Sequence, residues 1–208
     1  MIKGIIFDFD GVVAESVQVK TDAFMELYIL YGQDVVQKVR KHHEFNGGMS
    51  RYEKIKYYHK TFLDITLTQE EIMQLANQFS KLVVDRVIKA PYVQGVLEYI
   101  IKNHKKYKLF ISTGTPNGEI NTILKERGIA KYFTGVYGSP DKKNIHLDHI
   151  MMSFNLKPDE IIFYGDSKTD LDAAQKMNVE CILIKNQYNK NLFCNYNVKM
   201  IDNFISLL

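Results

Sequence analysis

Residues Ile5 to Val13 read IIFDFDGVV, a short apolar run that ends in two aspartates one residue apart. Ile5 to Phe7 predict a strand buried on both faces, and such a strand has no favourable place for an unpaired carboxylate. We therefore expect Asp8 and Asp10 at its C-terminal end, on the same side of the backbone, with Gly11 allowing a sharp turn. Two aligned carboxylates repel each other and imply a bound cation. Edge strands and turns can carry the same pattern, so this stretch alone leaves a purely structural interpretation open.

The length and composition of the chain indicate one globular core with room for a smaller insertion. Of its 208 residues 46% are hydrophobic, and 27 basic against 24 acidic residues give a net charge of +3. This near balance argues against a nucleic-acid-binding or membrane-surface protein. Cys181 and Cys194 are too few for a disulfide framework and are expected to be reduced. Asp8 comes too early for a signal peptide and no apolar run approaches the ~18 residues of a membrane span, so we expect a cytoplasmic protein.

The segment 16–88 is helical in its periodicity and contains no second buried-strand run. Apolar residues recur at helical spacing in four places. Two of these predicted helices begin with a capping-box pattern, Ser50 with Glu53 and Thr68 with Glu71. Four helices in one continuous segment predict a compact bundle.

After Pro91 the sequence changes to strands that alternate with helices. Buried strands are predicted at 108–112, 133–137, 161–164 and 181–184, and we expect the last of these to end the sheet. Such alternation implies an α/β fold, a parallel sheet with right-handed crossovers and helices on both faces. The tail beyond the last strand offers little pattern, except that Asp202 is expected to cap a final turn.

Polar residues follow three of the predicted strands, where a buried core does not explain them. Asp8 and Asp10 follow the first strand, Thr113 the second and Asp166 the fourth. In open parallel sheets, ligands bind beyond the carboxyl ends of the strands. One site could therefore gather all of these side chains.

Four short motifs occur in order along the chain, DFDGVV at 8–13, FISTG at 110–114, SPDKKN at 139–144 and YGDSKTD at 164–170. Together they resemble the signature of the haloacid dehalogenase superfamily of phosphohydrolases, over a span from Gly4 to about Ile184. This resemblance implies a Rossmann-like catalytic core formed by 1–15 and 89–208, with 16–88 inserted as an α-helical cap.

The resemblance also implies a role for each motif, and the chemistry suits the residues. Mg²⁺ neutralises carboxylate and phosphate oxygens, so that Asp8 can attack phosphorus and form an aspartyl-phosphate. Asp10 would protonate the leaving oxygen and then take a proton from water. Thr113 and the backbone amides around Gly114 would hold the transferred phosphoryl oxygens.

The remaining motif residues would bind the metal and balance the charge. Asp166 would bind Mg²⁺ together with Asp8 and the backbone carbonyl of Asp10, and Asp170 would hold a metal ligand or water one helical turn later. A lysine of the third motif would offset the shared negative charge. Lys143 is favoured over its neighbour Lys142 because it is better spaced ahead of the next predicted helix.

The resemblance leaves more than one activity open. The dehalogenase branch of the superfamily lacks the acid at Asp10, so its presence favours phosphate esters. Phosphomutases that resemble this family usually carry a histidine where this chain has Lys20, which favours a phosphatase of a small phosphorylated metabolite over a sugar phosphomutase. A non-catalytic receiver-like phosphoacceptor domain is a third alternative, although it would need neither Asp10 nor a cap.

Other polar residues receive weaker predictions. Arg51 follows a glycine-rich loop that tends to face the site in this family, where it would grip an anionic or hydroxyl-rich part of the substrate; a solvent-exposed arginine is the alternative. Lys20 would line the site entrance or cap the first helix. His146 and His149 have the spacing of metal ligands, but without a third ligand we expect surface histidines.

Overall fold

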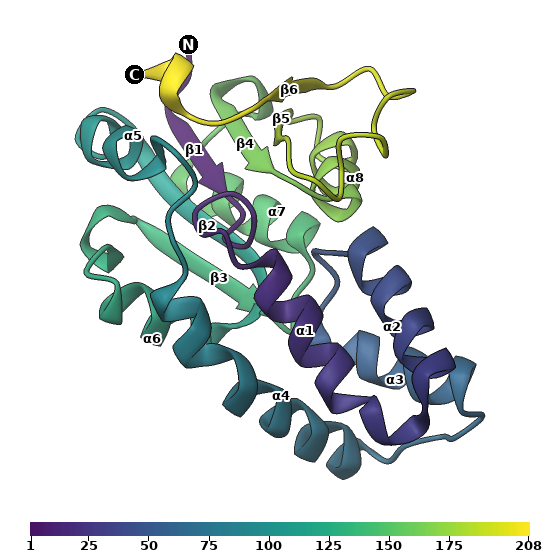
Figure 1. Ribbon diagram of the computed structural model, residues 1–208. Coiled ribbons are helices and arrows are strands. Elements are labelled where there is room, and N and C mark those ends of the chain that lie inside the picture. Colours follow the sequence, from purple (N-terminus) through teal and green to yellow (C-terminus); the bar gives the residue numbers. More distant parts are fainter.

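The apolar runs of the sequence form the centre of a six-stranded parallel sheet in the computed structural model, which describes residues 1–208 (Figure 1). The strands are β1 (Gly4–Phe7), β2 (Lys108–Pro116), β3 (Gly135–Ser139), β4 (Ile161–Gly165), β5 (Glu180–Ile184) and β6 (Lys199–Ile201). They lie in the order β3-β2-β1-β4-β5-β6, and all neighbours are parallel. Because β1 lies between β2 and β4, the direction of winding reverses there, and ligands bind beyond the carboxyl ends of strands at such a point. The predicted α/β fold is confirmed.

Alternate residues of β1 pack on opposite faces of the sheet. The helices that cover the two faces are α5 (Val96–Asn103), α6 (Asn117–Glu126), α7 (Lys143–Phe154) and α8 (Lys168–Lys176). Ile5 and Phe7 share a buried cluster with side chains of α5 and α6, whereas Ile6 belongs to a second cluster with α7 and α8. As the sequence predicted, β1 is buried on both faces, and a charge at its end must therefore be paired or bound.

Four helices leave the sheet between β1 and β2, and they are called the helix group below. They are α1 (Val17–Leu27), α2 (Gln33–Phe45), α3 (Arg51–Phe62) and α4 (Gln69–Lys89), with a 3-10 turn at Ile29–Tyr31. Figure 1 shows them together beyond the carboxyl end of β1, at the lower right. Thr68 forms a full capping box with Glu71, and Ser50 accepts a hydrogen bond from the Glu53 N–H, so both predicted helix starts are confirmed.

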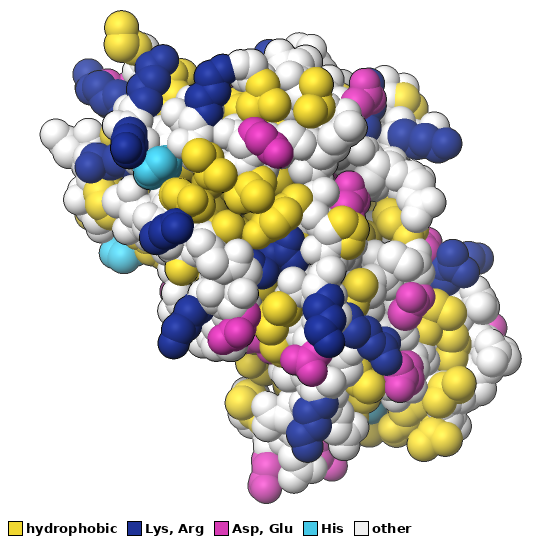
Figure 2. Space-filling view, turned by 60° about the vertical axis from the view of Figure 1, so that its left-hand side comes forward, with side chains coloured by type: hydrophobic (Ala, Val, Ile, Leu, Met, Phe, Trp, Pro, Cys, Tyr) yellow, Lys and Arg dark blue, Asp and Glu magenta, His cyan; other side chains and the backbone are white.

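The surface carries both signs of charge. On the face drawn in Figure 2, acidic and basic side chains are interspersed, and hydrophobic side chains gather near the centre. This mixture fits the small net charge of the chain. None of the helices combines the length and the apolar character that crossing a bilayer requires.

The strands β2 and β3 differ from their predicted bounds, and β6 was not predicted. β2 continues past Ser112 to Pro116, and β3 begins at Gly135 rather than 133. β6 pairs with β5 in the tail, so the strand at 181–184 is not the last one. β6 has only three residues, too few for a periodic signal, and its pairing partner rather than its own sequence makes it a strand.

Phe204 anchors the C-terminal tail in the core. It is fully buried. Its ring centroid lies 6.1 Å from that of Phe7, 5.2 Å from that of Tyr99 and 5.0 Å from that of Tyr164. The final turn is capped by Asn203, whose Oδ1 accepts the Ile205 N–H at 2.9 Å, and the prediction that Asp202 caps it is wrong. The tail thereby ends beside the N-terminus, at the top of Figure 1.

We predict that Phe204→Ala lowers the free energy of unfolding by about 3–5 kcal/mol, because it removes a buried ring and leaves a cavity. Chemical denaturation followed by circular dichroism measures this loss. Ile205→Ala is the control, since that side chain is 51% exposed, and it should cost less than about 0.5 kcal/mol. Equal effects of the two variants would mean that the tail does not stabilise the sheet.

Candidate active site

The carboxyl ends of β1, β2 and β4 meet at one small pocket. It is lined by the predicted residues Asp8, Asp10, Thr113, Gly114 and Asp166, and also by Val17, Lys20, His43, Gly47 and Gly48 from the helix group and its connections. Its volume is about 20 Å³, which is room for roughly one water molecule. The structure therefore shows the site closed over by the helix group.

Asp8 lies directly after β1. Its Oδ1 accepts the Phe9 N–H at 2.7 Å, and its Oδ2 lies 2.8 Å from Lys143 Nζ. Burial, together with the charges of Asp170 and Asp10, raises the pKa of Asp8 to about 7, although the charge of Lys143 opposes this rise. Lys143 alone thus does not bring the pKa of Asp8 down to that of an exposed aspartate. A bound cation would supply the missing positive charge.

Lys143, rather than Lys142, points into the site. Its Nζ lies 2.8 Å from Asp8 and 2.5 Å from Asp170, and its side chain is 5% exposed. Burial alone would lower the pKa of Lys143, but the two carboxylates outweigh burial and raise it. Lys142 is 71% exposed and faces Glu53 at 3.5 Å. The geometry therefore places Lys143 rather than Lys142 in the site, which is the lysine that the helix-start argument favours.

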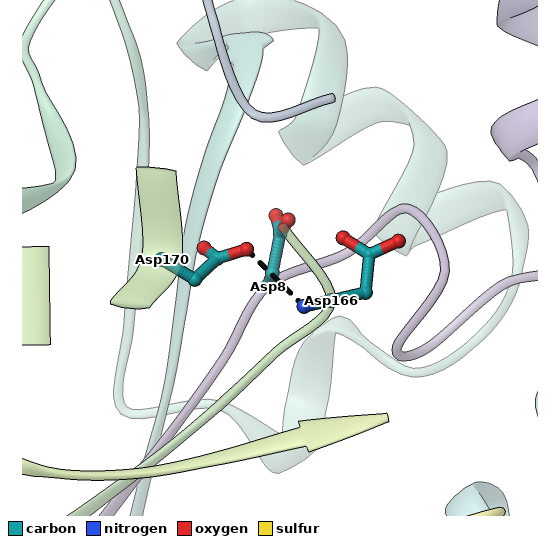
Figure 3. Close-up of side chains that lie close together, drawn as sticks. All are labelled: Asp8, Asp166 and Asp170. Carbon is teal, nitrogen blue, oxygen red and sulfur yellow. Dashed lines mark hydrogen bonds between the residues drawn. The ribbon is translucent and has the colours of Figure 1, made fainter. Parts of the chain in front are cut away.

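Three buried carboxylates, Asp8, Asp166 and Asp170, form a cluster in which Asp8 lies between the other two (Figure 3). One oxygen from each lies within 4.8 Å of the others. Burial and the charge of Asp8 raise the pKa of Asp166 well above its usual value. Asp166 Oδ2 accepts a hydrogen bond from Asn186 at 2.9 Å, while its Oδ1 accepts none. A set of oxygen donors with a free position suits a hard divalent cation.

Asp170 has less freedom than its partners to bind a metal. Its Oδ2 accepts the N–H groups of Asp166 at 3.2 Å and Ser167 at 3.0 Å, and the Ser167 hydroxyl at 2.6 Å. Its Oδ1 pairs with Lys143 at 2.5 Å. Because both oxygens are already engaged, the geometry gives Asp170 a supporting role that orients Lys143 and the turn carrying Asp166.

Asp10 also lines the pocket and is held by contacts with Ser16 and Lys20. The Ser16 hydroxyl donates to its Oδ1 at 2.6 Å, and Lys20 pairs with its Oδ2 while donating to Thr115 Oγ1 at 2.7 Å. Burial alone would raise the pKa of Asp10, but Lys20 and Ser16 outweigh burial and lower it. Lys20, which the sequence placed only at the entrance or at a helix cap, thus connects α1 to Asp10 and to the end of β2.

Glycines allow the loop between α2 and α3 to approach the strand ends closely. A Cβ at Gly114 would lie 2.8 Å from the Gly48 carbonyl oxygen. A Cβ at Gly48 would lie 2.9 Å from both Lys143 Nζ and Ser167 Oγ. Larger residues at either position would push the loop away from the site. The sequence predicted a loop here, but not that the loop covers the lysine.

Comparison with known proteins agrees with the four motifs. Residues 5–184 match the family model for haloacid dehalogenase-like hydrolases. The chain belongs to this family. A phosphoglycolate phosphatase of Photorhabdus laumondii is 28% identical to this hydrolase over 197 residues, 90% of the chain and 82% of the relative. A phosphorylated carbohydrates phosphatase of Thermotoga maritima is 24% identical over 189 residues, 87% of the chain and 84% of the relative.

Solved structures share the fold of this hydrolase. The β-phosphoglucomutase of Clostridium difficile superposes with a TM-score of 0.80 at 21% identity, covering 100% of this chain and 94% of that one. A predicted phosphoglycolate phosphatase of Haemophilus somnus superposes with a TM-score of 0.76 at 20% identity, covering 99% and 96%. At this level of identity the likeness concerns the fold alone.

Arg51 of this hydrolase forms a buried ion pair. Its Nη2 pairs with Glu119 Oε1, and its Nη1 donates to Glu119 Oε2 at 2.9 Å and to Ser80 Oγ at 2.5 Å. The guanidinium also lies 4.8 Å from the centroid of the Phe79 ring. The alternative of an exposed arginine is wrong, since the residue is 4% exposed. The guanidinium N–H groups that the sequence predicted to bind substrate already contact Glu119. This ion pair joins α3 to α6.

The two histidines of α7 differ from each other. His146 is buried, and its Nδ1 lies 3.0 Å from Ser112 Oγ. Burial, reinforced by the charge of Lys143, lowers its pKa to about 4, so His146 is a neutral core residue. The prediction of a surface histidine is wrong for His146 and confirmed for His149, which is exposed.

We predict that Arg51→Met and Glu119→Gln each lower the free energy of unfolding by about 3–5 kcal/mol, because each leaves a buried charge unpaired. The double variant should lose less than the sum of the two. A double-mutant cycle in urea measures this interaction. Lys60→Met, an exposed position on the same helix, is the control and should leave the unfolding midpoint unchanged. Strictly additive losses would contradict a coupled pair.

Proposed function

We propose that this hydrolase is a phosphatase of a small phosphorylated metabolite that uses Mg²⁺ and an aspartyl-phosphate intermediate. The observation that carries the proposal is the position of Asp8, whose buried carboxylate lies 2.8 Å from Lys143 Nζ and within 4.8 Å of a carboxylate oxygen of Asp166. The two relatives described above are named phosphatases, which supports a phosphoric monoester as the substrate.

In the first half of the reaction, Asp8 attacks phosphorus as the bond to the leaving oxygen breaks. Asp8 and Asp166 would hold Mg²⁺, which would supply positive charge to the crowded oxygens. The Thr113 hydroxyl and the Gly114 amide hold the phosphoryl oxygens, and Lys143 offsets charge at the nucleophile. Water then attacks the same phosphorus, and Asp8 is released as the carboxylate.

Asp10 serves both halves in opposite protonation states. Its pairing with Lys20 favours the carboxylate, which suits the removal of a proton from the attacking water. In the first half it must instead donate a proton to the leaving oxygen. An anionic phosphoryl group near Lys20 favours this, because the ammonium is then shared between two anions and stabilises the Asp10 carboxylate less.

The helix group, residues 16–88, acts in this proposal as a cap on a core formed by 1–15 and 89–208. Two observations support the division. The loop at Gly47 and Gly48 lies over Lys143 and Gly114, and the enclosed pocket is too small for a phosphorylated metabolite. The loop must therefore open to admit substrate, and its return excludes bulk water from the phosphoryl group.

We predict that the protein hydrolyses p-nitrophenyl phosphate with Mg²⁺ and stops when a chelator removes the metal. Asp8→Asn should lower kcat at least about 100-fold, since an amide cannot serve as the nucleophile. Asp202→Asn, at a side chain that is 79% exposed, is the matched control and should keep full activity. Phosphate release is the assay. A loss below about tenfold in Asp8→Asn would sink the nucleophile assignment.

Asp10→Asn should discriminate between leaving groups. Alkyl phosphates release a basic alkoxide that needs protonation, whereas p-nitrophenolate leaves without help. We predict that kcat falls at least about tenfold more on alkyl than on aryl phosphates, a comparison that steady-state kinetics provides. Equal losses on both substrates would contradict the role of Asp10 as the acid.

A further inference from the structure

Asn186 lies in the turn after β5, outside all four motifs, and binds the carboxylate of Asp166. Its Nδ2 donates a hydrogen bond to Asp166 Oδ2 at 2.9 Å. This is the only hydrogen bond that the Asp166 carboxylate accepts within the chain. Asp166 is 8% exposed, so the bond lies in a site that is largely shielded from water. One of the two oxygens of a carboxylate proposed to bind metal is therefore already engaged.

The side-chain amide of Asn186 has one orientation that satisfies its neighbours. Its Oδ1 accepts the N–H groups of Tyr188 at 2.9 Å and Asn189 at 3.0 Å. Because an amide nitrogen cannot accept these bonds, the oxygen must face the turn and the NH₂ group must face Asp166. The Asn186 side chain therefore presents a donor, and not an acceptor, to the carboxylate.

Asn189 holds the same turn against the end of β4. It is 3% exposed, and its Oδ1 accepts the Asn186 N–H at 2.9 Å. Its Nδ2 donates to the backbone carbonyls of Asp166 at 2.7 Å and Ile184 at 2.8 Å. The donor at Asp166 is thus fixed in place by hydrogen bonds before any ligand arrives.

Gly11 encloses the same oxygen of Asp166 from another side. A Cβ at Gly11 would lie 2.2 Å from Asp166 Oδ2. Figure 3 shows the two oxygens of Asp166 pointing in different directions, one toward Asp8 and the other away from it. With Asn186 and Gly11 both at Oδ2, the oxygen that Asp166 can offer to a cation is Oδ1.

This restriction matters because divalent cations differ in how they use a carboxylate. Mg²⁺ is small and takes one oxygen from each carboxylate in an octahedral arrangement, whereas Ca²⁺ takes roughly six to eight oxygens and accepts both oxygens of one carboxylate. Asp170 cannot replace the oxygen that Asn186 engages, since both of its own oxygens already accept hydrogen bonds. A site with few available oxygens disfavours the larger ion.

We propose that Asn186 is a positioning residue that selects Mg²⁺ over Ca²⁺ by leaving Asp166 a single oxygen for the metal. This inference rests on the proposed Mg²⁺ site and deepens it, since it assigns the choice of ion to a residue outside the motifs. Asn186 acts through Asp166 and does not itself contact the metal or the phosphate ester.

Two substitutions separate this role from the closing of the turn. Asn186→Asp keeps an oxygen for the two N–H groups of the turn but replaces the NH₂ group by an oxygen that cannot donate to Asp166. Asn186→Ser also keeps an acceptor for the turn, and its side chain is too short to reach Asp166. Asn195→Asp, at an exposed asparagine of the same tail, adds the same charge and is the matched control.

The test measures metal binding to the protein without substrate. Electron paramagnetic resonance reports free Mn²⁺, and displacement of bound Mn²⁺ by Mg²⁺ or by Ca²⁺ gives the Kd of each ion. The ratio of the Kd for Ca²⁺ to the Kd for Mg²⁺ should fall at least about tenfold in Asn186→Asp and in Asn186→Ser. In Asn195→Asp the ratio should stay within about twofold of the wild type.

Thermal melting without metal checks that each variant is folded, and if Asn186→Ser does not fold, Asn186→Asp decides the question. A ratio within about twofold of the wild type in either folded variant overturns the inference and leaves Asn186 a residue of the turn only. A wild type that binds both ions equally but hydrolyses p-nitrophenyl phosphate with Mg²⁺ also overturns this inference alone. A wild type that binds neither ion overturns the proposed function instead.

Discussion

The carboxylate of Asp8 ends a strand that is buried on both faces, and its burial is the constraint on which the site depends. A charge there is tolerated only with cations around it, so Lys143 must reach it from α7, and Asp170 must hold that lysine in place. Each of these residues starts from a different strand or helix end. The parallel sheet, by collecting carboxyl ends at one edge, makes the arrangement possible.

The sequence was sufficient for the elements with strong local signals. The apolar runs before Asp8, Thr113 and Asp166 predicted strands correctly, because strands that are buried on both faces need continuous apolar residues. Capping boxes likewise gave two helix starts. β6 was not readable, since its three residues become a strand only through pairing with β5.

Partners distant in the sequence set the limit of prediction at the site. Glu119, on another helix, forms an ion pair with the guanidinium of Arg51, and no sequence pattern near Arg51 predicts this partner. His43 and Asn186 lie outside every motif, and only the folded chain brings His43 to the pocket and Asn186 to Asp166. Local patterns thus located the carboxylates that line the pocket, whereas the surrounding donors depend on tertiary packing.

The two chain ends lie side by side at the top of Figure 1, at the start of β1 and away from the pocket. A short linker could join them without touching a motif. The chain could then be reopened in the turn before α4, where Asp64 and Ile65 are exposed. In such a circular permutant the strands of the sheet would follow one another without a long excursion through α1 to α4. The order in which the elements are synthesised could then be varied independently of the order in which they pack in this fold.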